Sequence, residues 1–216
     1  LEIEENIIEL YKMLYKCEHC NYSTKRLCDL RRHENRKFPC NRRTKVDTCV
    51  LEENNSTNNG ILSWATQSYT FEEAYFLFYG SSYNPEKPPE TNYIKMHGRK
   101  IYEFALNNVP LAMKAALVKS KVDVKDVKKI LIHQANEKMD EAIISRFYKL
   151  FDKEMPEGIM PMSIHKLGNS SVATVPTLYD LILNNQIENH EINPGDIIIL
   201  ASVGAGMNIN AIVYKQ

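Results

Sequence analysis

Long hydrophobic runs are absent from this 216-residue chain. The longest near-apolar run, residues 197–203, is far shorter than the roughly 20 residues that cross a bilayer, so we expect no membrane-spanning helix and no membrane partner. A basic-then-apolar leader is absent as well, and a cytoplasmic protein is therefore expected. The first residue is Leu1 rather than Met, which suggests that the sequence is a fragment.

Cysteine and glycine are both scarce, and each is confined to one part of the chain. None of the five cysteines follows Cys49, and none of the eight glycines precedes Gly60. Residues 11–46 carry 11 basic and 3 acidic side chains, although the chain as a whole is neutral. This asymmetry indicates two parts with different partners. We expect a short helix and a basic module over 1–50, a polar linker over 51–60 and a larger domain over 61–216.

The larger domain is predicted to belong to the α/β class. Buried strands are expected at 129–132, 196–202 and 208–214, and helices at 99–119, 137–151 and 172–183. Apolar strands that alternate with helices are typical of a layered domain with a parallel sheet. The aromatic-rich stretch 71–79 is expected to be helical, and the proline-rich stretch 83–92 to form a loop.

The basic module has the residue spacing of a zinc site. Cys17 and Cys20 are separated by two residues, His33 follows after twelve more, and Cys40 after a further six. Zinc takes four thiolate or imidazole ligands, and a two-residue gap lets a tight turn present two of them. We predict one structural zinc on these four residues, with Cys28 as an alternative to Cys40. Free thiols in a basic surface segment are the competing interpretation, and disulfides are disfavoured because five cysteines leave one unpaired.

Residues 15–40 resemble the ββα zinc finger, with a cysteine in place of its usual second histidine. The resemblance implies a helix whose register is set by Leu30, and which carries three base-reading residues: Arg26, Asp29 and Arg32. Further basic residues around them would contact nucleic-acid phosphates. One finger binds nucleic acid only weakly, so a role in folding or in protein contact is an equal alternative.

Three short motifs of the larger domain lie at predicted element ends, where α/β folds build their sites. His133 ends a strand within His-Gln-Ala-Asn, and Asn169 lies in a Gly-Asn-Ser-Ser turn before a helix. A glycine-rich turn, Gly204-Ala205-Gly206, joins the last two strands. Each motif alone has an ordinary structural explanation. The ordered set, with Met96-x-Gly98 before the first helix, is much more specific.

This set resembles the C-terminal half of β-ketoacyl-acyl-carrier-protein synthase III, of the thiolase-like superfamily, over residues 59–216. The resemblance implies an acyltransferase of fatty-acid or polyketide synthesis. Its reaction would be the decarboxylative Claisen condensation of an acyl thioester, such as acyl-CoA, with malonyl-acyl carrier protein. These phosphopantetheine thioesters are substrates, and the resemblance implies no tightly bound cofactor in the α/β domain.

The resemblance also assigns roles to residues. His133 and Asn169 would hydrogen-bond the malonyl thioester oxygen, on which decarboxylation leaves charge, and His133 is expected to be a neutral Nε2–H donor. The turn of Gly204, Ala205 and Gly206 would offer a backbone N–H to the oxyanion of acyl transfer. Contacts to the carrier protein or its pantetheine arm would come from Lys138, Met96 and Gly98. A solvated helix lysine is an equal alternative for Lys138.

The nucleophilic cysteine of the resembled family has no counterpart here. In the family it precedes the histidine by well over a hundred residues, and the surroundings of Cys49 do not match its setting. Three interpretations remain open. The chain is an incomplete or chimeric product that is inactive alone, or a subunit of a split synthase in which another polypeptide supplies the missing N-terminal half. The expected partner is that half or a homodimer mate. Alternatively, the chain is a zinc-finger module that binds nucleic acid or protein and carries a non-catalytic thiolase-like scaffold.

Overall fold

The computed structural model describes residues 15–16, 23–24, 59–88 and 90–216. The chain divides into two compact units, residues 1–45 and 46–216. In the first unit, strand β1 (Tyr15–Lys16) pairs antiparallel with β2 (Ser23–Thr24). The helices expected at the N-terminus and in the finger, and most of the expected linker, lie outside the described residues.

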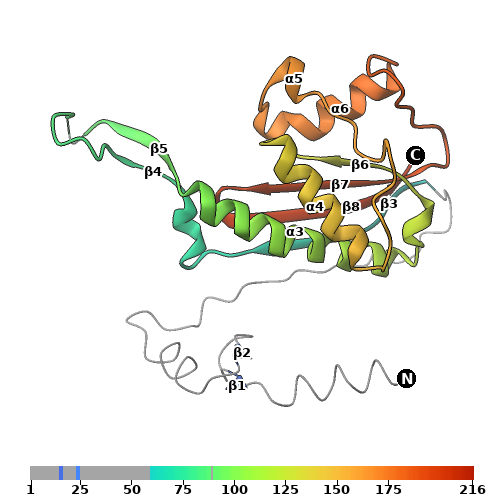
Figure 1. The fold of residues 1–216 in the computed structure, drawn as a ribbon, viewed down its shortest axis with the longest axis horizontal. Coiled ribbons are helices and arrows are strands. Elements are labelled where there is room, and N and C mark those ends of the chain that lie inside the picture. The colour runs from blue at the N-terminus through green and yellow to red at the C-terminus, as the bar shows by residue number, and fades with distance from the viewer. Residues whose placement is uncertain (1–14, 17–22, 25–58, 89) are drawn as a thin grey trace. The chain divides into compact units, whose positions relative to one another are not determined.

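The second unit is built on a four-stranded sheet in the order β3-β8-β7-β6 (Figure 1). β6 is parallel to β7, whereas β8 is antiparallel to both β7 and β3. The expected parallel sheet is therefore correct only for β6 and β7. A three-residue turn reverses the chain after β7, and such a short connection can join only antiparallel neighbours. The four strands are β3 (Gly60–Ser68), β6 (Val127–Ile132), β7 (Ile197–Gly204) and β8 (Asn208–Lys215).

One face of the sheet is covered by two helices, α3 (Gly98–Ser120) and α4 (Glu137–Lys149), which pack against each other (Figure 1). The buried face of α3 is rich in alanine, which lets its backbone approach the strands closely. Ser63 of β3 illustrates this approach, because its buried hydroxyl donates to the Ala116 carbonyl of α3 at 2.6 Å. The expected helices at 99–119 and 137–151 are confirmed to within two residues.

The other face of the sheet is covered only in part. Helix α6 (Thr174–Leu183) packs on β6 and β7, where Leu178 and Ile182 contact Leu131 and Ile198. No helix among the described residues covers this face over β3 and β8. A shallow groove of about 350 Å³ lies there instead, and five side chains line it: Ile61, Trp64, Thr66, Asn210 and Ile212.

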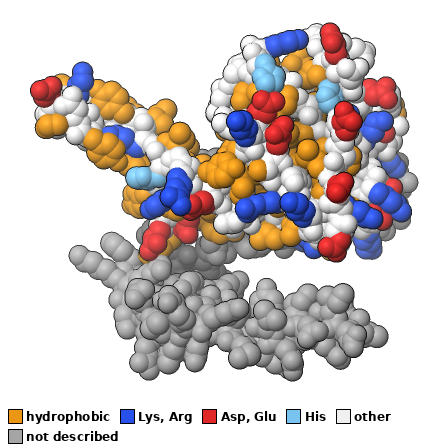
Figure 2. All heavy atoms as spheres, in the orientation of Figure 1, with side chains coloured by type: hydrophobic (Ala, Val, Ile, Leu, Met, Phe, Trp, Pro, Cys, Tyr) orange, Lys and Arg blue, Asp and Glu red, His pale blue; other side chains and the backbone are white. Residues whose placement is uncertain are grey.

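A separate antiparallel hairpin of β4 (Leu77–Ser81) and β5 (Asn92–Met96) projects from the unit (Figure 1). The helix expected at 71–79 is wrong, because only Glu73–Phe76 forms a short 3-10 turn and the aromatic residues that follow pair as a strand. The proline-rich stretch connects the two strands, as expected of a loop. Apolar side chains line the hairpin (Figure 2), and Tyr79 and Ile94 are 70% and 79% exposed.

Four short helical segments complete the described part of the domain. They are Val124–Asp126, α5 (Ile164–Leu167), Ser171–Ala173 and Ala205–Met207. None of the helices in this part of the chain is long and apolar enough to cross a membrane.

Candidate functional site

His133 lies at the carboxyl edge of the two parallel strands. It directly follows Ile132, which pairs with Ala201 of β7, and its backbone N–H donates to the Ala201 carbonyl at 2.9 Å. Gly204 lies three residues beyond Ala201, at the same edge. Parallel strands in α/β folds bring their functional residues together at this edge. The histidine and the glycine turn therefore share the side of the sheet on which such sites are built.

The backbone N–H and carbonyl of Ser171 join His133 to Asn169. Nδ1 of His133 lies 3.1 Å from the Ser171 carbonyl oxygen, and the Ser171 N–H donates to Oδ1 of Asn169 at 2.9 Å. Two residues that are far apart in the sequence thus meet on one backbone unit. Asn169 is exposed, and its Nδ2 has no hydrogen-bond partner among the described residues. Its amide can therefore donate to a ligand.

The stretch between α5 and α6 is shaped by two left-handed residues. Gly168 ends α5 with a φ of 64°, and Ser171 has a φ of 54°, which is uncommon for a residue with a side chain. The side-chain hydroxyl of Thr174, which is buried, donates to the Ser171 carbonyl at 2.9 Å. Regular α6 consequently starts at Thr174, two residues later than the start expected from the sequence.

Burial lowers the pKa of His133, which favours the neutral ring, and the hydrogen bond to Ser171 opposes that shift. A carbonyl oxygen can only accept, so this contact is a hydrogen bond when Nδ1 of the ring carries a proton. The neutral Nε2–H donor that the resemblance implies stays a prediction.

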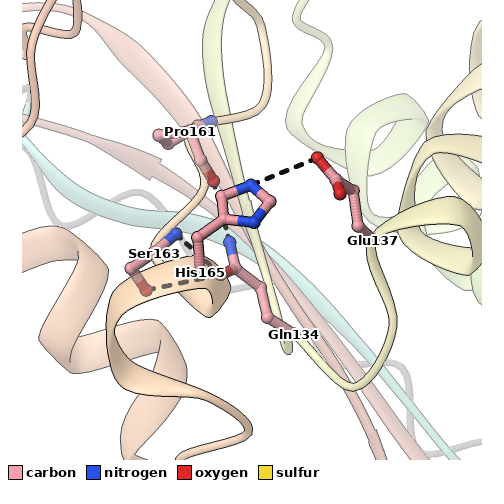
Figure 3. Close-up of polar contacts among 5 residues, drawn as sticks. All are labelled: Gln134, Glu137, Pro161, Ser163 and His165. Carbon is pink, nitrogen blue, oxygen red and sulfur yellow. Dashed lines mark hydrogen bonds and ion pairs between the residues drawn. The ribbon is translucent and has the colours of Figure 1, made fainter.

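Gln134, the second residue of the His-Gln-Ala-Asn motif, and Glu137, which follows the motif, contact residues 161–165 (Figure 3). Gln134 is fully buried, donates to the Pro161 carbonyl at 2.8 Å and accepts from the Ser163 N–H at 2.9 Å. Glu137 faces His165 of α5, with Oε1 and Nε2 3.3 Å apart. These contacts fasten the segment that leads to Asn169 against the end of β6. Sequence reasoning missed this role of Gln134, since an amide beside a histidine gives no sign of being buried.

The turn of Gly204, Ala205 and Gly206 is held by Asn208. The Asn208 amide donates to the Ala205 carbonyl at 2.9 Å, and its Oδ1 accepts from the Ser68 hydroxyl at 2.6 Å. Gly206 has a φ of 73°, and a Cβ there would come within 3.0 Å of the Asn208 amide nitrogen. The turn therefore has a defined backbone, which a role as an N–H donor would require.

The predicted carrier-binding residues lie on separate elements. Lys138 is exposed in the first turn of α4, whereas Met96 and Gly98 lie at the base of the projecting hairpin. Among the described residues, no hydrogen bond or ion pair links any of the three to His133 or Asn169. Their proposed contact with a carrier protein stays a prediction.

Asp140 is a buried acid that the sequence did not single out. It lies one turn into α4, is fully buried, and neither carboxyl oxygen has a hydrogen-bond partner of good geometry in the described part of the chain. Burial raises its pKa to about 8, the charges of Glu137 and Glu141 add to the rise, and the nearby backbone of Asn136 opposes it. The carboxyl is therefore largely protonated at pH 7.

The predicted metal and nucleic-acid residues lie outside the described residues. They are the zinc ligands Cys17, Cys20, His33 and Cys40, the alternative Cys28, and the base-reading set Arg26, Asp29 and Arg32. Within the residues that the structure does describe, no three His, Cys, Asp or Glu side chains gather into a group that could hold a metal ion.

The α/β domain has the thiolase-like fold. Two crystal structures resemble it, those of 3-oxoacyl-[acyl-carrier-protein] synthase III from Aquifex aeolicus VF5 and of β-ketoacyl-[acyl carrier protein] synthase III from Thermus thermophilus. Their TM-scores are 0.58 and 0.60, at 22% and 23% sequence identity. Each comparison covers 74% of this chain, but only 46% and 47% of the solved chains. At this identity the likeness establishes the fold.

The sequence comparisons point to one family. Residues 117–216 match the family model described as 3-oxoacyl-[acyl-carrier-protein (ACP)] synthase III C terminal. The β-ketoacyl-[acyl-carrier-protein] synthase III of Pyropia yezoensis is 36% identical over 129 residues, which cover 59% of this chain and 37% of the relative. The enzyme of the same name from Latilactobacillus sakei is 30% identical over 145 residues, with 62% and 41% covered. The matched residues therefore cover less than half the length of these relatives.

Proposed function

We propose that the α/β domain is the C-terminal half of a β-ketoacyl-acyl-carrier-protein synthase III-type acyltransferase. One observation carries the proposal: Ser171 joins His133 and Asn169 at the carboxyl edge of β6 and β7. The segment that matches the synthase family contains all three residues. The proposed reaction is a condensation of acyl-CoA with malonyl-acyl carrier protein, within fatty-acid or polyketide synthesis.

The reaction needs hydrogen-bond donors at one oxygen. When malonyl thioester loses CO2, the electrons of the broken C–C bond move onto the thioester oxygen. The resulting enolate carbon attacks the carbonyl of the acyl thioester and displaces the thiolate that carried the acyl group. Nδ2 of Asn169 is a donor without a competing partner in the described part of the chain. His133 can add a second donor when Nε2 also carries a proton. The Gly204–Gly206 turn is proposed to serve the other oxyanion, that of acyl transfer.

The acyl-carrying cysteine is proposed to come from a second polypeptide. The described residues contain no cysteine, and the sequence around Cys49 does not match the setting of the resembled nucleophile. The groove over β3 and β8 offers a docking surface, because Trp64 and Ile212 leave apolar area there and Ile61 is 47% exposed. Apolar surface that a domain leaves uncovered is often an interaction site. A chain that carries the N-terminal half of a synthase would fit this proposal.

Reconstitution tests the proposed function. The chain alone, incubated with acetyl-CoA or a longer acyl-CoA, should form no stable acyl adduct by intact mass. Mixed with an N-terminal synthase half, it should form a complex that condenses acyl-CoA with malonyl-acyl carrier protein. If no complex assembles, the two-chain proposal is wrong and the chain is an incomplete product. An adduct on the chain alone that Cys49→Ser removes would make Cys49 the nucleophile.

We also propose a structural zinc in the first unit, and one observation favours it. β1 and β2 pair with Tyr15 opposite Thr24 and Lys16 opposite Ser23, so Cys17 and Cys20 fall in the segment between two hydrogen-bonded strands. A hairpin of this kind presents the first two ligands of a finger. Metal analysis should find one zinc per chain, lost in Cys17→Ser. Unchanged zinc in that variant would reject the site, and unchanged zinc in Cys40→Ser would assign the fourth ligand elsewhere.

A further inference from the structure

We propose that Asn208 is a positioning residue whose side-chain amide, held by Ser68 of β3, fixes the backbone of the Gly204–Gly206 turn for acyl transfer. Asn208 acts through the turn and not on the substrate. The geometry of the turn stands by itself. Its effect on the chemistry rests on the proposed function, in which the turn serves the oxyanion of acyl transfer.

Asn208 lies where the ends of three strands meet. It is the first residue of β8, and it pairs with Ser68 at the end of β3 and with Gly204 at the end of β7. Both ends of its amide are engaged, because Nδ2 donates to the Ala205 carbonyl at 2.9 Å and Oδ1 accepts from the Ser68 hydroxyl at 2.6 Å. A carbonyl can only accept, so the Ala205 contact identifies the nitrogen of the amide and leaves the hydroxyl to donate to its oxygen.

The turn needs this support because its backbone is unusual. Gly206 and Met207 are both left-handed, with φ of 73° and 46°. A residue with a side chain keeps such a φ only where its surroundings over-determine it. Met207 is buried, and its carbonyl accepts from the Tyr69 N–H at 3.1 Å. The last residue of β3, Ser68, and the residue that follows it therefore hold the turn at two points.

The chemical consequence concerns one of the two oxyanions of the proposed reaction. When a thiolate attacks an acyl-CoA, the carbonyl electrons move onto oxygen. Collapse of this adduct expels the thiolate of coenzyme A and leaves the acyl group on the attacking sulfur. A backbone N–H stabilises the oxyanion only when it is aimed correctly, and a displacement of about 1 Å can cost about 10²-fold in rate. A misplaced turn should therefore slow acyl loading but spare malonyl decarboxylation, which is proposed to use His133 and Asn169.

The first test reads the turn directly in the full chain alone. Asn208→Asp keeps the size of the side chain and an acceptor toward β3, but it puts an oxygen in place of the donor to Ala205. The backbone amide signals of residues 205–207 should shift, and their hydrogen exchange should become about two- to tenfold faster, the factor expected from one lost hydrogen bond. Asn210→Asp is the matched control, because it adds the same charge at an exposed position of the same strand and should leave this exchange unchanged.

A second variant removes the anchor rather than the amide. Ser68→Ala deletes the donor to Oδ1 and should speed exchange in the turn in the same direction, by less than Asn208→Asp. It serves alone if Asn208→Asp does not fold. Turn amides that match the wild type in Ser68→Ala and in a folded Asn208→Asp would reject the positioning role.

The third test separates positioning from a purely structural role. In the reconstituted complex at saturating acyl-CoA, Asn208→Asp should lower acyl loading of the partner's cysteine by about tenfold to 10²-fold. Malonyl decarboxylation, measured after loading is complete, should keep the wild-type rate. A merely structural defect would lower both rates together, and that result, or unchanged loading, would overturn the proposal.

The outcomes also separate this proposal from the proposed function. Condensation by the wild-type complex, with turn amides unchanged in Asn208→Asp, would keep the synthase assignment and reject the role of Asn208. Altered turn amides in a chain that supports no condensation would keep Asn208 as the support of the turn and reject the synthase assignment.

Discussion

The two halves of the sheet differ in how completely they are covered. β6 and β7 are enclosed between the α3–α4 layer and α6, whereas the described residues cover β3 and β8 on one face only. Leu131 and Ile198 of the enclosed half are fully buried, while Trp64 and Ile212 of the open half remain partly exposed. The polar site lies at the end of the enclosed half. Its hydrogen bonds connect the end of β6 to the turn before α6, while the open half retains apolar area that another chain can cover.

The largest expected effect concerns the site at the end of the enclosed half. In the reconstituted complex, His133→Ala or Asn169→Ala should lower malonyl decarboxylation by about 10²–10³, because each removes a donor to the enolate oxygen. Acyl loading of the partner's cysteine should change little. His190→Ala is the control, since His190 lies near Lys129 at the start of β6, away from the carboxyl edge. Full decarboxylation in both site variants would make His133 and Asn169 structural residues.

Next is a direct contrast between the two halves. Leu178→Ala in the enclosed half should lower the free energy of unfolding by about 2–5 kcal/mol, since it leaves a cavity under α6. Trp64→Ala in the open half should cost the isolated chain less than half of that, but should weaken binding of the partner chain about tenfold or more. Urea unfolding and a binding titration measure the two quantities. Equal loss of stability in both variants, with partner binding intact, would remove the distinction.

A smaller effect is expected at Asp140, within the enclosed layer. Because burial raises its pKa to about 8, the folded state holds a proton that the unfolded chain releases near pH 4. This carboxyl therefore makes stability fall as pH rises between about 4 and 8, by on the order of a few kcal/mol. Asp140→Asn should flatten the pH dependence of the melting temperature, and Glu154→Gln, at an exposed position that does not contribute to the pKa of Asp140, should not. A parallel pH profile in Asp140→Asn would show that the carboxyl is solvated.

The smallest expected effect is the pH dependence of the chemistry. Burial lowers the pKa of His133, so its ring gains a second proton only at a pH below the usual range of histidine. If Nδ1 carries the proton of the neutral ring, Nε2 becomes a donor only in the cation, and decarboxylation by an already acylated complex should rise as pH falls from 8 toward 6, by at most about tenfold per unit. Asn169→Ala should keep this slope and His133→Gln should lose it. A rate independent of pH in the wild type would favour the neutral Nε2–H donor.

The sequence predicted those parts of the domain whose pattern is local. The spacing of apolar residues predicts the long amphipathic helices and the apolar strands. His133 and Asn169 stand out because each lies at one end of such a predicted element. The position of Ser171 between them could not be predicted, since its role is carried by backbone atoms in a left-handed conformation. Strand β3 was missed as well. Its half-buried face alternates only weakly, and its pairing depends on a distant segment.

That distant pairing has a consequence for the order in which the sheet is assembled. Ser68 and Asn208 sit opposite each other in β3 and β8 although 140 residues separate them. During synthesis β3 leaves the ribosome long before β8, the strand that pairs with it among the described residues. The backbone of β3 therefore stays unpaired with β8 until most of the domain has been made. Contacts so distant in sequence slow folding. We expect β3 to be the last strand to become protected and the segment most dependent on chaperones in the nascent chain.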